Sequence, residues 1–223
     1  KCHMEALRYR ITQAEREFYG ENLILLEGAI SEFLSCIDMI LRRRASLGES
    51  VPVCSMQCRI KGADSMRQKL RRQGLPVTAD SALHRVWDAA GVRLICPFVP
   101  EIYVVAKLVR AIPGIRILQE KDYVRRPKPN GYRSYHMVVS LPLRFLERQT
   151  QPVWLELQIR TIAMDCWASI EHELKYKKEI PNQKLIVQEL KRCADEIAST
   201  DLSLQTIREL IEGPQKEELP CGF

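Results

Sequence analysis

The sequence predicts an α+β fold in which a mixed β-sheet of about five strands is flanked by helices, with long helices at both ends of the chain. Two observations predict this fold. Apolar residues recur at helical spacing near both ends, whereas residues 91–161 hold short apolar runs separated by turn signals. The 223 residues suffice for one sizeable core, and 46% apolar with 28% charged residues is an ordinary globular composition.

Helices are expected before the strand-rich part. Apolar side chains at every third or fourth position predict amphipathic helices over residues 4–18 and 21–44, with Gly20 between them. A short helix over residues 63–73 is expected to end at Gly74, because glycine is common just past helix ends. The N-terminal part is therefore expected to be helical.

Strands are expected in the middle of the chain, over residues 91–98, 115–123, 134–143 and 153–161. Pro100 is typical of a helix start and opens a predicted helix over residues 101–112. The segment Lys128-Pro129-Asn130-Gly131 has the residues of a tight turn. This pattern of strands, helix and turn forms the expected sheet.

Two more amphipathic helices are expected at the C-terminal end. Apolar stripes cover residues 163–174 and 186–211, and Gly213-Pro214 closes the second stripe. Helices at the ends bury little surface alone, so we expect them to pack on the sheet or on other subunits. The expected division is a helical extension over residues 1–45, a central domain over 46–178 and a second helical extension over 179–223.

The cysteines and the lengths of the apolar runs indicate the expected cellular location. No apolar run is long enough to cross a bilayer, and no signal-peptide pattern opens the chain. Eight cysteines are present without a Cys-x-x-Cys pair, although Cys54 and Cys58 lie close together. Because Cys36 and Cys193 lie on apolar stripes and Cys96 in an apolar run, we expect buried, reduced thiols rather than disulfides or a metal site. A cytoplasmic protein without a membrane anchor is expected.

Basic residues are clustered rather than evenly spread. The net charge is +6, and the clusters lie at residues 42–44, 67–72 and 125–128. A solvated surface explains such clusters, but they are also typical of surfaces that bind the phosphates of nucleotides or RNA.

The densest polar segment runs from residue 122 to residue 136. It combines cations, an Asn-Gly turn and the aromatic rings of Tyr123, Tyr132 and Tyr135. Cations neutralise phosphates and a tyrosine ring can stack on a base. A surface hairpin with tyrosines at a sheet edge explains the same residues equally well.

Two carboxylates stand out because they lie in apolar strand contexts. Asp88 immediately precedes a predicted strand, and Glu156 lies inside one, where alternation places Trp154, Gln158 and Arg160 on the same face. Two carboxylates together with substrate phosphates suit Mg²⁺. Alternation alone, however, favours an exposed sheet face with an ordinary Glu–Arg pair.

Several sequence blocks carry a family resemblance: Arg59-Ile60-Lys61, Asp88-Ala89-Ala90-Gly91-Val92-Arg93, Asp122-Tyr123, Lys128-Pro129-Asn130-Gly131-Tyr132-Arg133-Ser134-Tyr135-His136 and Glu156-Leu157-Gln158-Ile159-Arg160-Thr161. In this order they resemble the synthetase domain of the RelA/SpoT alarmone enzymes. The following residues 163–177 resemble the stand-alone small alarmone synthetases of the RelQ/RelP kind. The resemblance covers residues 20–212 and implies a nucleotidyltransferase-like synthetase fold, with the central domain as the (p)ppGpp synthetase.

The resemblance implies roles for individual residues. Asp88 and Glu156 correspond to catalytic Mg²⁺ ligands, with Glu156 also a general base. The residues expected to hold ATP are Arg59, Lys61, Ser65, Lys69 and Arg93. The residues expected around the acceptor guanine nucleotide are Lys128, Asn130, Tyr132, His136, Gln158 and Arg160, with Tyr132 stacking on the base.

The resemblance also implies an activity and partners. A GTP/GDP pyrophosphokinase of the stringent response would move the β,γ-diphosphate of ATP to the 3′-hydroxyl of GDP, GTP or GMP and release AMP. No His-Asp motif of the family's hydrolase domain is present, so synthesis without hydrolysis is expected. A homotetramer formed through the terminal helices is expected, and regulation by an alarmone or by single-stranded RNA fits the same group.

Alternative functions remain open at this point. A related toxin-type enzyme would use tRNA 3′ ends or adenosine nucleotides as acceptors, and the basic clusters fit a non-catalytic RNA-binding module. Two departures from the family pattern, Tyr135 and Pro129-Asn130, bear on the preference among guanine nucleotides. They leave the chemistry intact.

Overall fold

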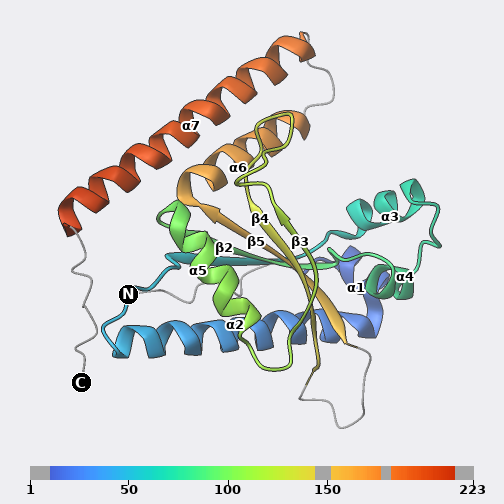
Figure 1. The fold of residues 1–223 in the computed structure, drawn as a ribbon. Helices are drawn as coiled ribbons and strands as arrows, with labels where there is room; N and C mark the ends of the chain where they lie inside the picture. Colours follow the sequence, from blue (N-terminus) through green and yellow to red (C-terminus); the bar gives the residue numbers. More distant parts are fainter. Residues whose placement is uncertain (1–10, 144–151, 177–181, 214–223) are drawn as a thin grey trace.

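The computed structural model describes residues 11–143, 152–176 and 182–213, and every structural statement below concerns these residues. The elements, shown in Figure 1, are α1 (Gln13–Tyr19), η1 (Gly20–Asn22), α2 (Leu23–Ser46), β1 (Ser55–Ile60), α3 (Ala63–Arg72), α4 (Ala79–His84), β2 (Ala90–Cys96), α5 (Val99–Arg110), β3 (Arg116–Asp122), β4 (Tyr135–Leu141), β5 (Val153–Thr161), α6 (Ile162–Tyr176) and α7 (Gln183–Glu212).

A single five-stranded sheet organises the chain, with strand order β1-β2-β5-β4-β3. Strands β2 and β5 pair in parallel and the other neighbours pair antiparallel, so the sheet is mixed, as expected. The four predicted strands are confirmed. The fifth strand, β1, and the short helix α4 were not predicted, because each has only six residues.

One face of the sheet builds the main hydrophobic core. Alternate residues of β4 and β5, such as Met137, Leu155 and Leu157, are fully buried there. Helices α2 and α5 contact the central strands β2 and β5. Phe33 of α2 and Ile102 of α5 are fully buried in the same core as these strand residues. The opposite face of the sheet is polar and carries the candidate site.

The N-terminal helices reach this site through hydrogen bonds. The break at Gly20 is confirmed, since this residue has a φ of +56° and separates α1 from the longer helix. The first part of the predicted helix 4–18 lies outside the described residues, and α1 begins at Gln13. The Tyr19 hydroxyl donates to the Lys61 carbonyl at 2.7 Å, and Glu15 accepts from the backbone N–H of Ala63 at 3.0 Å. Helix α1 therefore fixes the backbone at the start of α3.

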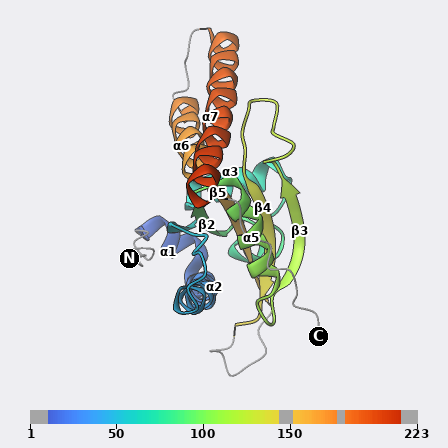
Figure 2. The ribbon, with the colours of Figure 1, turned by 60° about the vertical axis from the view of Figure 1, so that its left-hand side comes forward.

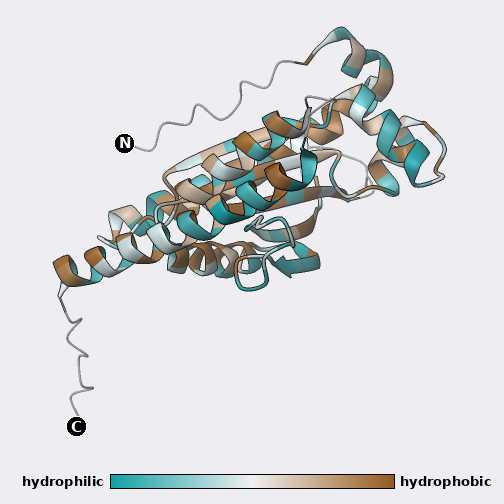
Figure 3. Cartoon of the chain, turned by 90° about the horizontal axis from the view of Figure 1, so that it is seen from above, coloured by the Kyte–Doolittle hydropathy of each residue, from teal (hydrophilic) through white to brown (hydrophobic). Residues whose placement is uncertain are grey.

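Helix α6 starts at the C-terminal end of β5, and α7 lies beside α6 (Figures 1 and 2). The Trp167 side chain donates from Nε1 to the Leu190 carbonyl at 2.8 Å, and Thr161 donates to Asp201 at 2.6 Å. Both predicted C-terminal helices are confirmed. Along α7 hydrophobic residues alternate with hydrophilic ones (Figure 3), and Ile207 and Ile211 are more than half exposed.

The cysteine predictions are confirmed in part. Cys96 is buried, Cys36 and Cys193 are half-buried, and these three carry free thiols. Cys54 and Cys166 are exposed, so the expectation of burial is wrong at both; Cys54 lies just outside β1 at the edge of the sheet. Within the described residues no helix combines the length and apolarity needed to cross a membrane.

Candidate active site

Strand register arranges the polar face of the sheet in rows. Since facing residues of paired strands point to the same side, Gln57, Arg93, Gln158, His136 and Lys121 form one row across all five strands. In the next row Arg59, Gly91 and Glu156 lie side by side on β1, β2 and β5. Five separate segments of the sequence thus meet on one surface.

A first hollow of about 250 Å³ lies over β1, β2 and β5. Its polar lining includes Arg59, Arg93, Glu156 and Gln158. Gly91 lies at its floor, where a Cβ atom would meet the Glu156 carbonyl oxygen at 3.5 Å and the Arg59 side chain at 3.9 Å. The missing side chain of Gly91 leaves room between a guanidinium and a carboxylate.

A second hollow of about 430 Å³ lies beside the first, over β4 and β5. Lys69, Asp88, Lys128 and His136 are among the residues that line it. Glu156 lines both hollows. A carboxylate at the boundary between two cation-lined hollows is suited to a reaction between two anionic molecules, one in each.

Asp88 is held by two lysines. Its carboxylate lies 3.1 Å from Lys61 Nζ and 2.7 Å from Lys69 Nζ. The backbone N–H of Lys61 donates to the Ala89 carbonyl at 2.8 Å, which places the lysine beside the aspartate. Burial raises the pKa of Asp88, but the charges and hydrogen bonds of Lys61 and Lys69 outweigh it, so the pKa lies below its ordinary value. Asp88 is therefore ionised at neutral pH.

The pKa of Glu156 is set by a similar balance between burial and neighbouring charges. Burial raises its pKa and the Asp88 charge adds to this, but His136 and Arg59 outweigh both and hold the pKa of Glu156 below its ordinary value. His136 Nδ1 lies 3.6 Å from the carboxylate, and Gln158 Nε2 donates to it at 3.0 Å. Glu156 is thus an ionised carboxylate that acts on its neighbours as a fixed negative charge.

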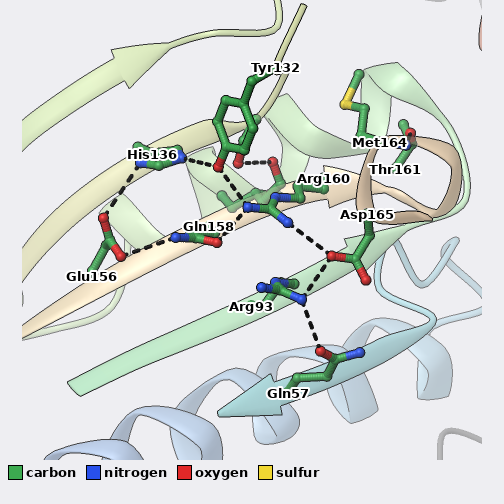
Figure 4. Close-up of polar contacts among 12 residues, drawn as sticks. Gln57, Arg93, Tyr132, His136, Glu156, Gln158, Arg160, Thr161, Met164 and Asp165 are labelled. Atoms are coloured by element: carbon green, nitrogen blue, oxygen red, sulfur yellow. Dashed lines mark hydrogen bonds and ion pairs between the residues drawn. The ribbon is translucent and has the colours of Figure 1, made fainter. Parts of the chain in front are cut away.

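Glu156 belongs to a closed ring of contacts (Figure 4). His136 Nε2 lies 2.8 Å from the Tyr132 hydroxyl, which accepts from Arg160 at 2.6 Å. Arg160 also donates to Gln158 Oε1 at 2.7 Å, and Gln158 donates back to Glu156. The ring fixes the rotamers of all its members, because each side chain is held from two sides.

Lys128 extends this ring toward the solvent. Its Nζ atom lies 4.8 Å from the ring centroids of both Tyr123 and Tyr132, which is within the range of cation–π attraction. The turn that carries it is confirmed, since Gly131 N donates to the Lys128 carbonyl at 2.8 Å. A cation between two aromatic rings is suited to a ligand with both phosphate and a planar base.

The structure brings most predicted site residues together. Those that line a hollow are Arg59, Lys69, Asp88, Arg93, Lys128, His136, Glu156 and Gln158. Lys61, Tyr132 and Arg160 join them through ion pairs or hydrogen bonds. Ser65 is exposed on α3, and the Asn130 side chain donates to Glu171 of α6 at 3.0 Å; neither lines the two hollows described.

Two residues of the network were missed from the sequence. Asp165 accepts from Arg93 and Arg160, and Gln57 accepts from Arg93 at 3.2 Å. Gln57 lies on the unpredicted strand β1, where polar and apolar residues alternate, and this short alternation was the available signal. Asp165 lies within the residues 163–177 that resemble small synthetases, and a carboxylate five residues after Arg160 of the predicted strand was the available signal.

The carboxylates that could hold a metal are Asp88 and Glu156, which line the second hollow together. Within the described part of the chain no cluster of three or more His, Cys, Asp or Glu residues could hold a metal ion. A pair of hard oxygen donors without a complete protein cage is the donor set of an ion that is also bound by substrate phosphates.

Residues 58–181 match the family described as the region found in RelA / SpoT proteins. The chain belongs to the RelA/SpoT family. Within this family it is 40% identical over 144 residues to GTP pyrophosphokinase YwaC of Bacillus subtilis (strain 168), an alignment that covers 65% of this chain and 68% of the relative. It is 32% identical over 164 residues to GTP pyrophosphokinase YjbM of the same strain, covering 74% of this chain and 76% of the relative.

Solved structures agree with this membership of the RelA/SpoT family. The crystal structure of small alarmone synthetase 1 from Bacillus subtilis bound to its product pppGpp matches with a TM-score of 0.77 and 30% identity, covering 86% of this chain and 98% of that one. The resemblance to small alarmone synthetases and the predicted fold class are confirmed.

Proposed function

We propose that this RelA/SpoT chain is a pyrophosphokinase that transfers the β,γ-diphosphate of ATP to the ribose 3′-hydroxyl of GDP or GTP and releases AMP. The observation that carries the proposal is the position of Glu156 at the boundary of two cation-lined hollows. The similarity to two GTP pyrophosphokinases and to an alarmone synthetase bound to pppGpp supports this substrate class.

ATP is proposed to occupy the first hollow and its border with the second. Arg59 and Arg93 both line the first hollow, and planar guanidinium groups stack on bases and pair with phosphates. Lys61 and Lys69 extend the positive charge toward Asp88. Ser65 completes the predicted donor set on α3, one turn before Lys69.

The guanine nucleotide is proposed to occupy the second hollow. Tyr132 offers a ring for stacking, Lys128 offers positive charge, and the His136 imidazole lies beside the Tyr132 ring. Gln158 and Arg160 hold the Tyr132 side of the site through the ring of contacts. Asn130 supports the loop through Glu171 and Tyr132, so its proposed role here is to shape the acceptor loop.

Mg²⁺ is the proposed cofactor, held by Asp88 and Glu156. Both carboxylates line one hollow, and both have pKa values below the ordinary range, so they are ionised and available to a cation. When bound, Mg²⁺ would neutralise negative charge on the transferred phosphates. Lys61 and Lys69 supply the same kind of stabilisation from the protein itself.

The transfer balances as a substitution at the β-phosphorus of ATP. The 3′-oxygen forms a bond to this phosphorus, the bond between the phosphorus and the α,β-bridging oxygen breaks, and AMP leaves with the electron pair. Glu156 is proposed to accept the proton of the 3′-hydroxyl as general base. Positioning and charge neutralisation by Arg59, Lys69 and Arg93 would supply most of the acceleration.

The test is incubation with γ-labelled ATP, Mg²⁺ and GDP, GTP, GMP or tRNA in parallel. Label on GDP or GTP with AMP release is expected, and Glu156→Gln is expected to lose at least about a thousandfold in kcat. Glu173→Gln is the matched control, because it removes the same charge from an exposed position on α6. Transfer to tRNA alone, or no transfer by the folded protein, would refute the proposal.

Assembly and regulation are further parts of the proposal. Exposed apolar residues of α7 support a homotetramer that forms through the terminal helices. Light scattering on the wild type and on Ile207→Lys tests this: a monomer mass for the wild type would contradict it. Alarmone regulation and single-stranded RNA binding stay predictions from the resemblance, and a cytoplasmic location stays a prediction from the cysteines and the apolar runs.

A further inference from the structure

Asp165 contacts two arginines of the site with one carboxylate oxygen (Figure 4). Its Oδ1 atom lies 2.9 Å from Arg93 NH1 and 3.0 Å from Arg160 NH1. Arg93 lines the first hollow, and Arg160 belongs to the ring that contains Tyr132. One carboxylate thus connects the side of the site proposed for ATP with the side proposed for the guanine nucleotide.

The position of Asp165 is fixed by its local structure. It lies in the first turn of α6, which directly follows β5. The backbone N–H of Met164 donates to Thr161 Oγ1 at 3.1 Å, and Thr161 itself donates to the buried Asp201 of α7. The helix start is therefore held at both the strand and α7, and the Asp165 side chain is only 16% exposed.

The two arginines need a shared counter-charge. Burial lowers the pKa of Arg93, the Arg160 charge lowers it further, and the Asp165 charge opposes both effects. The Nε atoms of Arg93 and Arg160 are buried and, within the described residues, have no hydrogen-bond acceptor. Asp165 therefore holds one edge of each guanidinium. Arg93 lines the first hollow, whereas Arg160, whose side chain is 4% exposed, reaches the acceptor side through its contact with Tyr132.

We propose that Asp165 is a positioning residue that sets the guanidiniums of Arg93 and Arg160 for the two nucleotides at once. The inference rests on the proposed function and adds to it a residue through which both substrates are held. Gln57 contacts Arg93, and Gln158 contacts Arg160, whereas Asp165 contacts both guanidiniums. Loss of Asp165 is therefore expected to weaken both substrates, not one.

The test measures binding without turnover. Calorimetry with a non-hydrolysable ATP analogue alone and with GDP alone is run on the wild type and on Asp165→Asn. We expect Kd for each ligand to rise about tenfold, since a charge-assisted hydrogen bond to each arginine is lost. Glu173→Gln is the matched control, and its two Kd values are expected to equal those of the wild type.

A general loss of structure is separated from positioning by two further variants. Asp165→Glu keeps the charge and is expected to bind both ligands within about threefold of the wild type. If Asp165→Asn fails to fold in a melting scan, Asp165→Ser replaces it. The same rise in both Kd values is expected. A change in only one Kd, or in neither, overturns the inference. Failure of the proposed function is seen separately, as absence of transfer by the wild type.

Discussion

At the residue scale, the Tyr132 hydroxyl connects Arg160 with His136 in the closed ring of contacts. It accepts from Arg160 at 2.6 Å and lies 2.8 Å from His136 Nε2. The Tyr132 ring also packs against a small cluster formed by Trp167 and Ala194. The ring position therefore depends on packing, and the positions of Arg160 and His136 depend on the hydroxyl.

The separate roles of the Tyr132 ring and the Tyr132 hydroxyl predict the effect of Tyr132→Phe. The phenyl ring is retained for stacking, but Arg160 loses an acceptor and His136 loses a partner. We expect KM for GDP to rise about tenfold while KM for ATP stays within about twofold. Initial-rate kinetics with each nucleotide varied in turn measures both values.

Tyr103→Phe is the matched control for this prediction. It also removes a tyrosine hydroxyl that donates to a carboxylate, that of Asp122 at 3.2 Å, but Tyr103 lines neither hollow described. Both KM values are expected to stay at the wild-type level. Equal changes in the two variants would mean that the Tyr132 hydroxyl has no special role.

The sequence identified the carboxylates of the site but not the partners that organise them. Asp88 and Glu156 were visible because charged residues beside apolar strands require an explanation. Gln57 and Asp165 act only through neighbours brought close by strand pairing and by the turn from β5 into α6. Such pairings depend on register across the sheet, which a single sequence does not contain.

At the element scale, α7 contacts the loop that contains Gly131 and Arg133, which is proposed to hold the acceptor. Gly131 has a φ of +89°, and a Cβ atom there would lie 2.5 Å from Ala194 Cβ. Arg133 of the same loop donates to the Ala194 carbonyl and to Asp195, both at 3.4 Å. A C-terminal helix thus sets the shape of a loop about 60 residues earlier in the chain.

Gly131→Ala is predicted to be more harmful than an alanine at another positive-φ glycine. Left-handed backbone with a Cβ costs about 1–2 kcal/mol of unfolding free energy, and the clash with Ala194 adds about 1–3 kcal/mol. Gly74→Ala is the matched control, because Gly74 has a φ of +67° and nothing within 4 Å of its Cβ position. Urea unfolding of both variants measures the difference, and equal losses would contradict the close contact.

The contact between Asp201 of α7 and Thr161 of β5 predicts that the Tm depends on pH. Burial raises the pKa of Asp201 above its ordinary value, although the Thr161 hydrogen bond and the Arg133 charge oppose this. A carboxyl with a raised folded-state pKa destabilises the fold once pH rises through that pKa. Asp201→Asn stays neutral and can still accept from Thr161, so we expect it to raise Tm at pH 7.

The difference between Asp201→Asn and the wild type is expected to shrink as pH falls below the ordinary pKa of an aspartate, because both side chains are then neutral. Thermal melts at several pH values measure it. A lower Tm for the variant at pH 7 would show that the ionised Asp201 stabilises the docking.

Element predictions from the sequence succeeded where periodicity was long. The limits of β5 and the break between α1 and α2 were predicted because alternation, or a glycine, marks each of them. Strand β1 was missed although Ser55–Ile60 alternate polar and apolar side chains, because six residues at the edge of the sheet give only a short signal. Edge strands are half-covered, so their sequences are under weaker constraint.

At the scale of the whole molecule, one face of the sheet builds the hydrophobic core and the other carries the candidate site. One face is buried against α2 and α5, and the other presents rows of charged side chains from five segments. The division into residues 1–45, 46–178 and 179–223 stays a prediction. The contacts of Tyr19 with Lys61 and of Ala194 with the acceptor loop connect both helical extensions to the central part.

The central claim is that an intact diphosphate crosses from one hollow to the other at Glu156. The most direct measurement uses ATP that carries distinguishable labels on its β- and γ-phosphates, with GDP as acceptor. We expect both labels to appear together on the guanine nucleotide, in equal amount to unlabelled AMP. Transfer of the γ-label alone, with the β-label retained in ADP, would contradict the account.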